Sequence, residues 1–422
     1  MRHVIVGAGP AGVIAADTLR RLDPDCNITL VGDEPEPPYS RMAIPYYLVD
    51  QIDERGTYLR KAADHFESRG IEHLHDRVSH VDADKQAVSL SSGSELAYDR
   101  LLIATGSKPL VPAIPGIESP GVHACWTLED ARNIIRLAKP GAQVVLIGAG
   151  FIGSIILEAL ARRGTRLSVV EVEDRMVPRM MNLVSGSLIR RWCEQKGLQI
   201  LTSTRVEAIE TVGDQRKLQV RLDKGDGLEA DLVITATGVR PNTGFLDNSG
   251  IETDQGILVN RQLQSSEANI YAAGDVARGL DFSTGGYSVQ AIQPTAVEHG
   301  RIAAANMAGH TQTHRGNINM NVLETMGLIA TSFGLWMGVD GGDSTELHDA
   351  SRFRYLNLQF QEDRLIGASS LGLTEHVGVI RGLIQTRLPL GVWKSRLIKD
   401  PTRLMEAYLA NTQAVGYNSQ VL

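Results

Sequence analysis

The sequence predicts an α/β protein in which one parallel-sheet unit occurs twice, followed by a third region of α+β character. Three observations support this prediction. A strand-like apolar run leads into a glycine-rich turn near the N-terminus, the same arrangement recurs from residue 143, and each is followed by a second strand that ends in an acidic residue. At 422 residues the chain is also long enough for two or three domains.

The first glycine-rich turn follows directly on a strand. Residues 3–12 read His-Val-Ile-Val-Gly-Ala-Gly-Pro-Ala-Gly and lead into a helix predicted over residues 13–22. Gly7 permits the tight turn, Gly9 lets the backbone approach a pyrophosphate, and Gly12 lets the helix pack closely on the strand. The free N–H groups of the helix N-terminus favour phosphate. A dinucleotide site is therefore predicted here.

The next strand, residues 27–32, ends in two acidic residues, Asp33 and Glu34. A carboxylate about 20 residues after such glycines accepts hydrogen bonds from the ribose hydroxyls of the dinucleotide. Glu34 is the preferred candidate for this role, and Asp33 is its competitor.

The whole pattern recurs in the middle of the chain. The glycines are Gly148, Gly150 and Gly153, a helix is predicted over residues 154–163, and the following strand ends in Glu171. One such motif is a weak signal, because glycine-rich turns also occur in folds that bind nothing. Two complete copies predict two Rossmann-like domains, each with a dinucleotide site.

The second site also indicates which nicotinamide nucleotide binds there. Glu171 and Glu173 make the predicted ribose pocket acidic, so the 2′-phosphate of NADPH would meet like charge. The arginine that accommodates this phosphate is missing from the strand end, although Arg175 is near. NADH is therefore expected in preference to NADPH.

Composition excludes several other functions. The net charge is −7 and no cluster of Lys and Arg stands out, so nucleic acid is not an expected partner. The longest nearly apolar run, residues 144–157, is shorter than a membrane span. The chain enters a strand at once, which leaves no room for a signal peptide, and a cytoplasmic protein is expected. Cys26, Cys125 and Cys193 form no closely spaced pair and are expected to be small buried side chains.

Further motifs occur in a characteristic order. They are an acid-Pro-Tyr-x-Arg stretch at residues 34–41, a strand and turn at residues 101–106, a matching return at residues 232–242, and a Gly-Asp motif within residues 269–277. Together with the two glycine turns they resemble the pyridine-nucleotide:disulfide oxidoreductase superfamily. The resemblance is closest to the branch that contains rubredoxin and ferredoxin reductases and the flavoprotein part of NADH-dependent nitrite reductase.

The resemblance implies an interleaved domain order. The FAD domain would comprise residues 1–113 and 243–313, with an NAD domain at residues 114–242 inserted between them. A C-terminal interface domain of α+β type would follow at residues 314–422. The implied cofactors are FAD, held by the first domain, and NADH.

The last region carries its own local signals. Residues 354–368 are predicted to form a hairpin, and residues 374–386 and 401–411 have helical character. Basic residues between 387 and 403 either form a solvated face or dock an acidic electron-transfer protein. A homodimer is also possible.

The resemblance assigns cofactor contacts residue by residue. The expected FAD contacts lie in both segments of the first domain: Gly7, Gly9, Pro10, Ala11, Gly12, Asp33, Glu34, Arg41, Val78, Ala104, Thr105, Gly106, Gly274, Asp275, Thr295 and Ala296. The expected NAD contacts are Gly148, Gly150, Phe151, Ile152, Gly153, Glu171, Thr237 and Gly238.

Four of the FAD-domain residues have implied roles. Arg41 would contact the FAD pyrophosphate, and Asp275 would bind the ribitol and cap a helix that begins there. A helix that begins around residue 293 would point its N-terminus at the flavin pyrimidine. Glu298 and His299 of that helix face either the flavin or solvent. Hydride transfer needs positioning rather than an acid, so no catalytic side chain is assigned.

The chain also departs from the family pattern. Residues 40–47 contain no cysteine, which excludes the usual disulfide and sulfenate chemistry. Many members carry a glutamate and a lysine where this chain has Ile155 and Tyr46. A single charge left buried without its partner would destabilise the fold. The absence of both charged residues from this chain is therefore energetically consistent.

Three functional hypotheses follow. The first is an NADH-dependent reductase that passes electrons from FAD to a separate acceptor, a rubredoxin- or ferredoxin-type protein. The second is an NADH oxidase or a small-molecule or quinone reductase. The third is a regulatory or assembly subunit that senses NADH.

Overall fold

The computed structural model describes residues 1–213 and 217–418, and the side chains up to residue 412. Its contacts divide the chain into two compact units. Unit 1 comprises Met1–Leu110, Trp126–Arg132 and Val239–Asn317, whereas unit 2 comprises Val111–Cys125, Asn133–Gly238 and Ile318–Leu422. Both units are discontinuous in sequence, and the three predicted domain boundaries stay a prediction.

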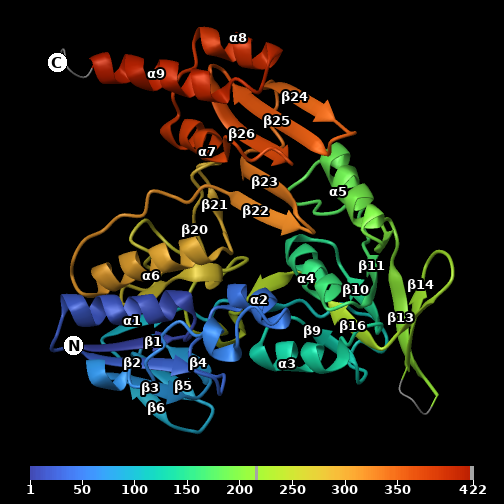
Figure 1. Ribbon diagram of the computed structural model, residues 1–422. Helices are drawn as coiled ribbons and strands as arrows, with labels where there is room; N and C mark the ends of the chain where they lie inside the picture. Colours follow the sequence, from blue (N-terminus) through green and yellow to red (C-terminus); the bar gives the residue numbers. More distant parts are fainter. Residues whose placement is uncertain (214–216, 419–422) are drawn as a thin grey trace. The chain divides into compact units, whose positions relative to one another are not determined.

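Unit 1 is built on a five-stranded parallel sheet (Figure 1). Its strands are, in spatial order, β19 (Ile270–Ala272), β7 (Arg100–Ile103), β1 (Arg2–Val6), β2 (Asn27–Gly32) and β3 (Ile71–His75). The central strands are almost entirely buried, as expected for a parallel sheet covered on both faces. Every ladder in it is parallel, which confirms the predicted sheet type.

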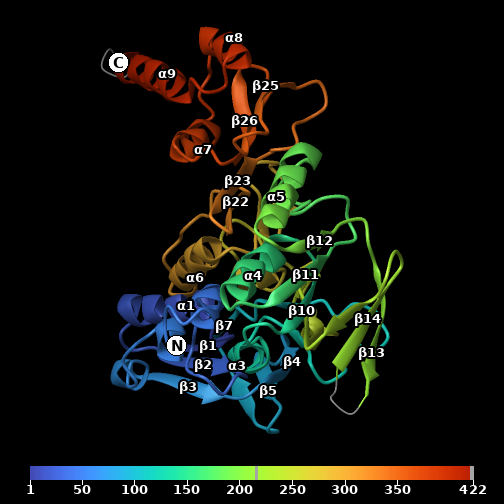
Figure 2. The same ribbon diagram turned by 45° about the vertical axis from the view of Figure 1, so that its right-hand side comes forward.

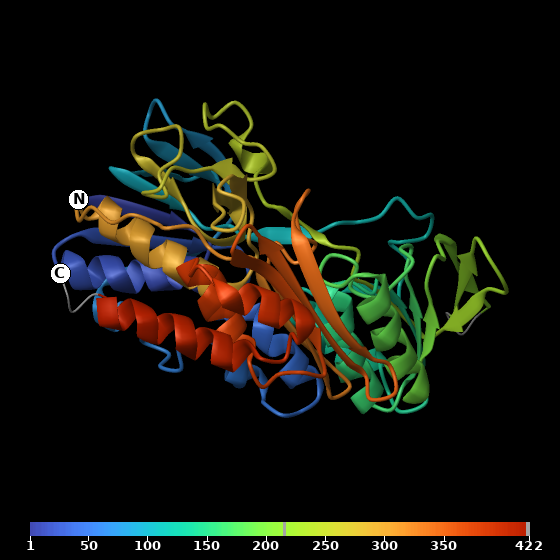
Figure 3. The same ribbon diagram turned by 90° about the horizontal axis from the view of Figure 1, so that it is seen from above.

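Two helices lie side by side in this unit, α1 (Pro10–Leu22) and α6 (Gln293–Met307), as Figures 1 and 3 show. Their close approach depends on Gly300, where an added Cβ would lie 2.4 Å from the carbonyl oxygen of Ala11. Residues almost three hundred positions apart in sequence are thereby brought to the same place.

Smaller elements complete unit 1. They are the antiparallel sheet β4 (Val78–Asp82), β5 (Ala87–Leu90) and β6 (Glu95–Ala97), the sheet β18 (Ile257–Leu258), β20 (Ala277–Leu280) and β21 (Tyr287–Ser288), and the pair β8 (Ser107–Pro109) and β17 (Val239–Pro241). The pair matters for the topology, because it joins the segment that leaves the unit to the segment that returns. The short helix α2 (Ile44–Leu48) follows the acid-Pro-Tyr-x-Arg stretch.

Unit 2 contains a second five-stranded parallel sheet. In spatial order its strands are β12 (Gln199–Leu201), β11 (Arg166–Val170), β10 (Gln143–Ile147), β16 (Leu232–Thr235) and β9 (Val122–Ala124). The helices of this region are α3 (Leu128–Leu137), whose first residues belong to unit 1, α4 (Phe151–Arg162) and α5 (Leu183–Gln195). A small antiparallel sheet, β13 (Val206–Val212), β14 (Lys217–Leu222) and β15 (Leu228–Ala230), projects from it (Figure 2).

The C-terminal part of unit 2 is an antiparallel sheet with helices on one side (Figure 3). Its strands are β22 (Met320–Thr325), β23 (Leu328–Gly334), β26 (Arg364–Leu371), β25 (Arg354–Gln361) and β24 (Asp343–Asp349), and its helices are α7 (Val377–Thr386), α8 (Val392–Lys399) and α9 (Leu404–Asn418). The predicted hairpin is present as β25 and β26. Among the described residues, no helix is long and apolar enough to cross a membrane.

Candidate cofactor sites

The first glycine turn has the shape of a phosphate cradle. Gly7 has a φ of +111°, and a Cβ there would lie 2.2 Å from the carbonyl oxygen of Ala104. A Cβ on Gly12 would lie 1.9 Å from the carbonyl oxygen of Gly7, so the three segments meet backbone to backbone. At Gly9, by contrast, a Cβ would have nothing within 4 Å. This open face leaves room for the pyrophosphate that the sequence predicts there.

Helix α1 presents free backbone donors at this turn. Its N-cap is Gly9, no side chain caps it, and Pro10 lies in the first turn. The helix begins three residues earlier than predicted, because Gly12 packs inside the helix rather than before it. The first-turn N–H groups and the helix dipole therefore suit the negative charge of a dinucleotide.

The second glycine turn repeats the first. Gly148 has a φ of +101°, a Cβ on it would lie 2.5 Å from the carbonyl oxygen of Ala236, and a Cβ on Gly153 would lie 2.1 Å from the carbonyl oxygen of Gly148. Gly150 has open space around it and caps α4 without a side-chain bond. Half-buried Phe151 and Ile152 form the first turn of α4, three residues earlier than predicted. Thr237 and Gly238 directly follow Ala236, the residue whose carbonyl oxygen lies close to Gly148.

The predicted ribose acid of the second site is bound to its own turn. Buried Glu171 accepts hydrogen bonds from the backbone N–H of Ala149 (2.6 Å) and of Glu173 (2.9 Å). Arg175, the cation near this site, pairs with Asp174 at 2.6 Å and donates to the carbonyl of Met181 at 2.9 Å. Glu171 thus fixes the turn, and Arg175 is held by protein groups.

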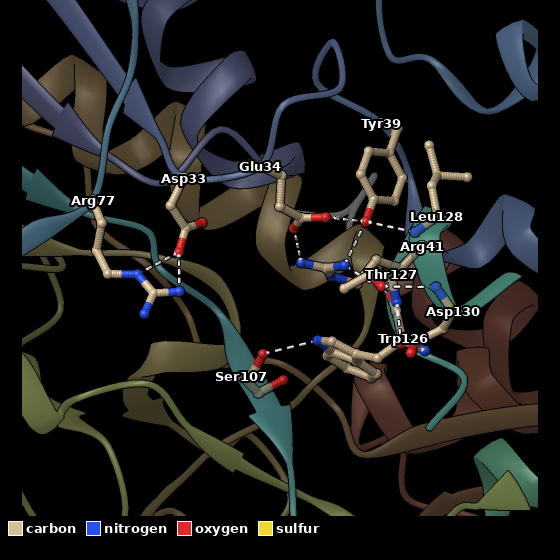
Figure 4. Close-up of polar contacts among 10 residues, drawn as sticks. All are labelled: Asp33, Glu34, Tyr39, Arg41, Arg77, Ser107, Trp126, Thr127, Leu128 and Asp130. Carbon is tan, nitrogen blue, oxygen red and sulfur yellow. Dashed lines mark hydrogen bonds and ion pairs between the residues drawn. The ribbon is translucent and has the colours of Figure 1, made fainter. Parts of the chain in front are cut away.

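The acid-Pro-Tyr-x-Arg stretch of unit 1 forms a polar cluster (Figure 4). Both carboxylate oxygens of Glu34 are engaged, one by the hydroxyl of Tyr39 and the other by Arg41, each at 2.5 Å. Arg41 also donates to the Tyr39 hydroxyl and to the carbonyl of Trp126, both at 2.7 Å. Burial raises the pKa of Tyr39 above its usual range, so it stays a hydrogen-bond donor.

Asp33 lies differently from Glu34. One of its carboxylate oxygens pairs with Arg77 at 2.9 Å, and both side chains are largely exposed. Its other oxygen has no partner among the described residues (Figure 4). Of the two predicted ribose acids, Asp33 has one carboxylate oxygen without a protein donor, whereas each oxygen of Glu34 already accepts one hydrogen bond.

Sequence reasoning missed the segment that begins at Trp126. Its indole donates to the carbonyl of Ser107 at 3.2 Å, and Asp130 accepts from the backbone N–H of both Trp126 (3.0 Å) and Thr127 (2.9 Å). Thr127 and Asp130 form a capping box, because the Thr127 hydroxyl in turn accepts from the N–H of Asp130 at 3.1 Å. The Thr-x-x-Asp spacing was the sequence signal that could have revealed it.

One of the two expectations for Asp275, the helix cap, is wrong, and the other, ribitol binding, stays a prediction. It is not a helix cap: Gly274–Val276 is a single 3₁₀ turn with Ala273 at its N-cap, and α6 begins only at Gln293. The chain continues from this turn into β20, which is why no helix starts here. The carboxylate is largely shielded and accepts a hydrogen bond from the Ser107 hydroxyl at 2.9 Å. Burial raises its pKa, against the opposing effect of Ser107.

Several predicted FAD residues do converge. A Cβ on Gly274 would lie 3.3 Å from the Cβ atoms of both Ala11 and Ala296, so the two helix N-termini meet at the 3₁₀ turn. Thr105 closes the same region by donating to the carbonyl of Asn242 at 2.9 Å, and the adjacent Gly106 has open space around it. The side chain of Val78, on β4, lies in the same hydrophobic core as those of Ala11, Ala104 and Ala296.

The N-terminus of α6 has an uncapped first turn and a buried polar network behind it. The N-cap Ile292 makes no side-chain bond. The buried hydroxyl of Thr295 accepts from Asn317, whose side chain also hydrogen-bonds His314. Sequence reasoning did not foresee this network. His299 is buried edge-on against His314, with ring centroids 4.7 Å apart, while Glu298 is exposed.

The cysteines of the described residues form no redox pair. Cys26, Cys125 and Cys193 are buried and form no disulfide, as expected. Ile155 is half-buried and Tyr46 is exposed.

Comparison with known proteins decides the family. Residues 1–308 match the family model "Pyridine nucleotide-disulphide oxidoreductase". The chain belongs to this family. It is therefore a flavin-dependent oxidoreductase that uses a nicotinamide nucleotide, although it lacks the redox-active disulfide in its described residues.

Individual family members match over almost the whole chain. The epsilon subunit of NADH-dependent phenylglyoxylate dehydrogenase from Aromatoleum evansii is 30% identical over 416 residues, 97% of this chain and 98% of that one. Rhodocoxin reductase from Rhodococcus erythropolis is 30% identical over 392 residues, 92% and 91% of the two chains. The crystal structure of the covalent putidaredoxin reductase–putidaredoxin complex matches with a TM-score of 0.88 and 27% identity over 97% of this chain and 99% of that one.

Proposed function

We propose that the protein oxidises NADH and delivers the electrons singly to a separate iron–sulfur or rubredoxin-type protein. The observation that carries this proposal is the pair of open glycine cradles, each at an uncapped helix N-terminus, in a chain whose described cysteines form no second redox centre. Bound FAD supplies the conversion of a two-electron donor into one-electron steps. The reductases among the relatives support the same acceptor class.

The positions of several residues in unit 1 suit the separate parts of FAD. Gly9 and the first turn of α1 would hold the pyrophosphate, and the uncapped start of α6 would favour negative charge on the ring. Asp275 is shielded from solvent and offers a carboxylate to the ribitol. We assign the adenosine ribose to Asp33 in preference to Glu34, because one oxygen of Asp33 accepts no hydrogen bond from the protein, whereas each oxygen of Glu34 already accepts one.

Gly150 and the first turn of α4 would bind the NADH pyrophosphate in the same way. Arg175 pairs with Asp174 and donates a hydrogen bond to the carbonyl of Met181, so it is not placed to bind a 2′-phosphate. This supports NADH over NADPH as the substrate. We further propose that the reaction takes place in the cytoplasm, where NADH is supplied by metabolism.

The test is anaerobic. NADH added to the purified protein should bleach the flavin absorbance, and an oxidised rubredoxin or ferredoxin should restore it faster than a quinone or air does. Protein that carries no flavin, or flavin that NADH does not reduce, would contradict the proposal. Rapid oxygen uptake without gain from an iron protein would instead establish an NADH oxidase, the activity of a relative from Methanocaldococcus jannaschii.

A second candidate function has its own observation. The match to a dehydrogenase subunit spans 98% of that subunit, so a whole chain of this kind is known to act inside a larger enzyme. In such an enzyme the chain would exchange electrons between NADH and partner subunits. Purification under native conditions distinguishes the two, since a subunit would co-purify with partners in fixed ratio and turn over slowly with every free acceptor.

A further inference from the structure

Three metal-ligating side chains from three different elements meet at the amino end of the first sheet. His3 lies on β1, Asp23 directly follows α1, and Cys26 directly precedes β2. One ligand atom from each can be chosen such that all three lie within 4.8 Å of one another. This place is at the opposite end of β1 from the glycine turn, so the cluster is no part of the cofactor cradle.

The surroundings of His3 indicate that an ion or water binds there. It is 1% exposed, and both of its ring nitrogens are buried without a hydrogen-bond partner. A buried polar atom without a hydrogen-bond partner destabilises the folded state, and an ordered water or ion usually satisfies it. A metal ion would accept the lone pair of one ring nitrogen and remove the penalty for that nitrogen.

The other two groups complete a plausible donor set. Cys26 is 3% exposed, and its thiol donates only to the backbone carbonyl of Asp23, at 3.1 Å. Asp23 is half-buried and leaves a path to solvent, while one of its carboxylate oxygens receives a weak bond of 3.3 Å from the N–H of Asp25. Imidazole, thiolate and carboxylate together are typical of zinc-like ions rather than of Mg²⁺ or Ca²⁺.

The loop that carries Asp23 and Cys26 is held in shape. Arg20 donates to the carbonyls of Pro24 (2.6 Å), Cys26 (2.9 Å) and Gly70 (2.8 Å). Zinc ligands lie about 2.0–2.3 Å from the metal, so ligand atoms in a tetrahedral site are about 3.5 Å apart. Side-chain rotations that move these atoms by about 1 Å would close the site without a change in the backbone.

We propose that His3, Asp23 and Cys26 bind one divalent transition-metal ion of zinc type, with water as the fourth ligand. The ion ties the start of β1 to the loop between α1 and β2 and stabilises the first unit. On binding, the thiol of Cys26 releases its proton to solvent and the sulfur coordinates as thiolate. The proposal does not rest on the proposed function.

The test uses the full-length, FAD-loaded protein and two probe ions. Co²⁺ should bind with one ion per chain, give a thiolate-to-cobalt charge-transfer band in the difference spectrum, and give ligand-field bands beyond the flavin absorbance. Zn²⁺ should displace it and raise the melting temperature by several degrees, because an ion that binds only the folded state stabilises it.

Three variants identify the ligands. Cys26→Ser should abolish the charge-transfer band and weaken Co²⁺ binding at least about tenfold, and Asp23→Asn, at a half-buried position that tolerates change, should weaken it without loss of the band. Cys125→Ser is the matched control and should bind as the wild type does. Flavin content and circular dichroism verify folding of each variant.

Two results would overturn the proposal. One is Co²⁺ binding without a thiolate band, which would mean that surface carboxylates alone take up the ion. The other is equal Co²⁺ affinity of the wild type and Cys26→Ser. If Cys26→Ser does not fold, Asp23→Asn decides alone: unchanged affinity in that variant overturns the proposal.

Discussion

The two nucleotide units share a turn but differ in what surrounds it. In unit 1 the cradle is enclosed by a second helix N-terminus, the 3₁₀ turn at Gly274 and the polar cluster of Glu34, Tyr39 and Arg41. In unit 2 the turn is braced mainly by one acid, Glu171, which bonds the backbone of the turn itself. The same motif can therefore serve a cofactor that must stay and a substrate that must leave.

The largest effect is expected when a side chain is introduced into each of the two glycine turns. Gly9 and Gly150 have ordinary φ values of −78° and −72° and open space around them, so valine adds bulk without backbone strain. Gly9→Val should yield protein without flavin and without turnover. Gly150→Val should keep its flavin and raise the KM for NADH at least about a hundredfold, or about 2.7 kcal/mol. Flavin absorbance and steady-state kinetics measure both, and flavin loss in Gly150→Val would refute the division of labour.

Unit 1 should also be acid-sensitive. Burial, and to a lesser extent His314, lowers the pKa of His299 to about 3, well below its unfolded value of about 6.5. The unfolded state therefore binds the extra proton first. Stability from this group is complete above about pH 6.5 and falls by about 1.4 kcal/mol per pH unit as the pH drops toward 3.

The matched variant is His299→Leu, which keeps the bulk and removes the titration. In urea unfolding followed by flavin release, the change of unfolding free energy with pH should match the wild type near pH 7.5. Near pH 5 it should be smaller by about one proton. The remaining slope would come from other groups, including His3 and His73, whose pKa values burial lowers to about 4. An unchanged slope would show that His299 is not the sensor.

A pair of acid-to-amide changes sharpens the comparison further. Glu171→Gln should destabilise the protein by about 1.5–3 kcal/mol and raise the KM for NADH, because charge-assisted bonds to the turn are weakened. Asp33→Asn should change unfolding free energy by less than about 0.5 kcal/mol and only weaken FAD binding, because its side chain is exposed. Urea unfolding and flavin dissociation rates separate the two effects. Equal destabilisation by both variants would mean that Glu171 and Asp33 contribute equally to stability, which contradicts the comparison.

A last prediction concerns the polar cluster of Glu34, Tyr39 and Arg41. Tyr39→Phe removes the hydroxyl that serves Glu34, Arg41 and the N–H of Leu128, and should cost about 1–2 kcal/mol of stability and speed flavin loss. Tyr58→Phe is its control, since that hydroxyl makes one 3.5 Å contact with Glu54. If the two variants retain flavin equally well, the polar cluster plays no part in cofactor binding.

Local sequence signals predicted the two turns because their physics is local. A glycine is needed at residues 7, 12, 148 and 153 to avoid a collision with backbone only a few residues away or on the adjoining strand. The helix starts were placed three residues late for the same reason, since Gly12 and Gly153 read as boundaries although they lie within helices.

The surroundings of the sites could not be predicted in the same way. The bond from Ser107 to Asp275 joins residues 168 positions apart, and that from Leu128 to Tyr39 joins residues 89 apart. No periodicity or spacing encodes such contacts. The network of Thr295, Asn317 and His314 was missed because amide and imidazole side chains carry no signature until the fold brings them together.

The discontinuity of unit 1 has a consequence for synthesis on the ribosome. Strand β7 pairs with β19, and the neighbouring residues Arg100 and Asn269 are 169 positions apart. The outer edge of β7 therefore stays unpaired while all of the second parallel sheet is made, and α6 arrives later still. Exposed strand edges promote association between nascent chains. The first sheet of the chain is therefore completed only after the second one. Expression at low temperature or with chaperones should raise the yield of this protein.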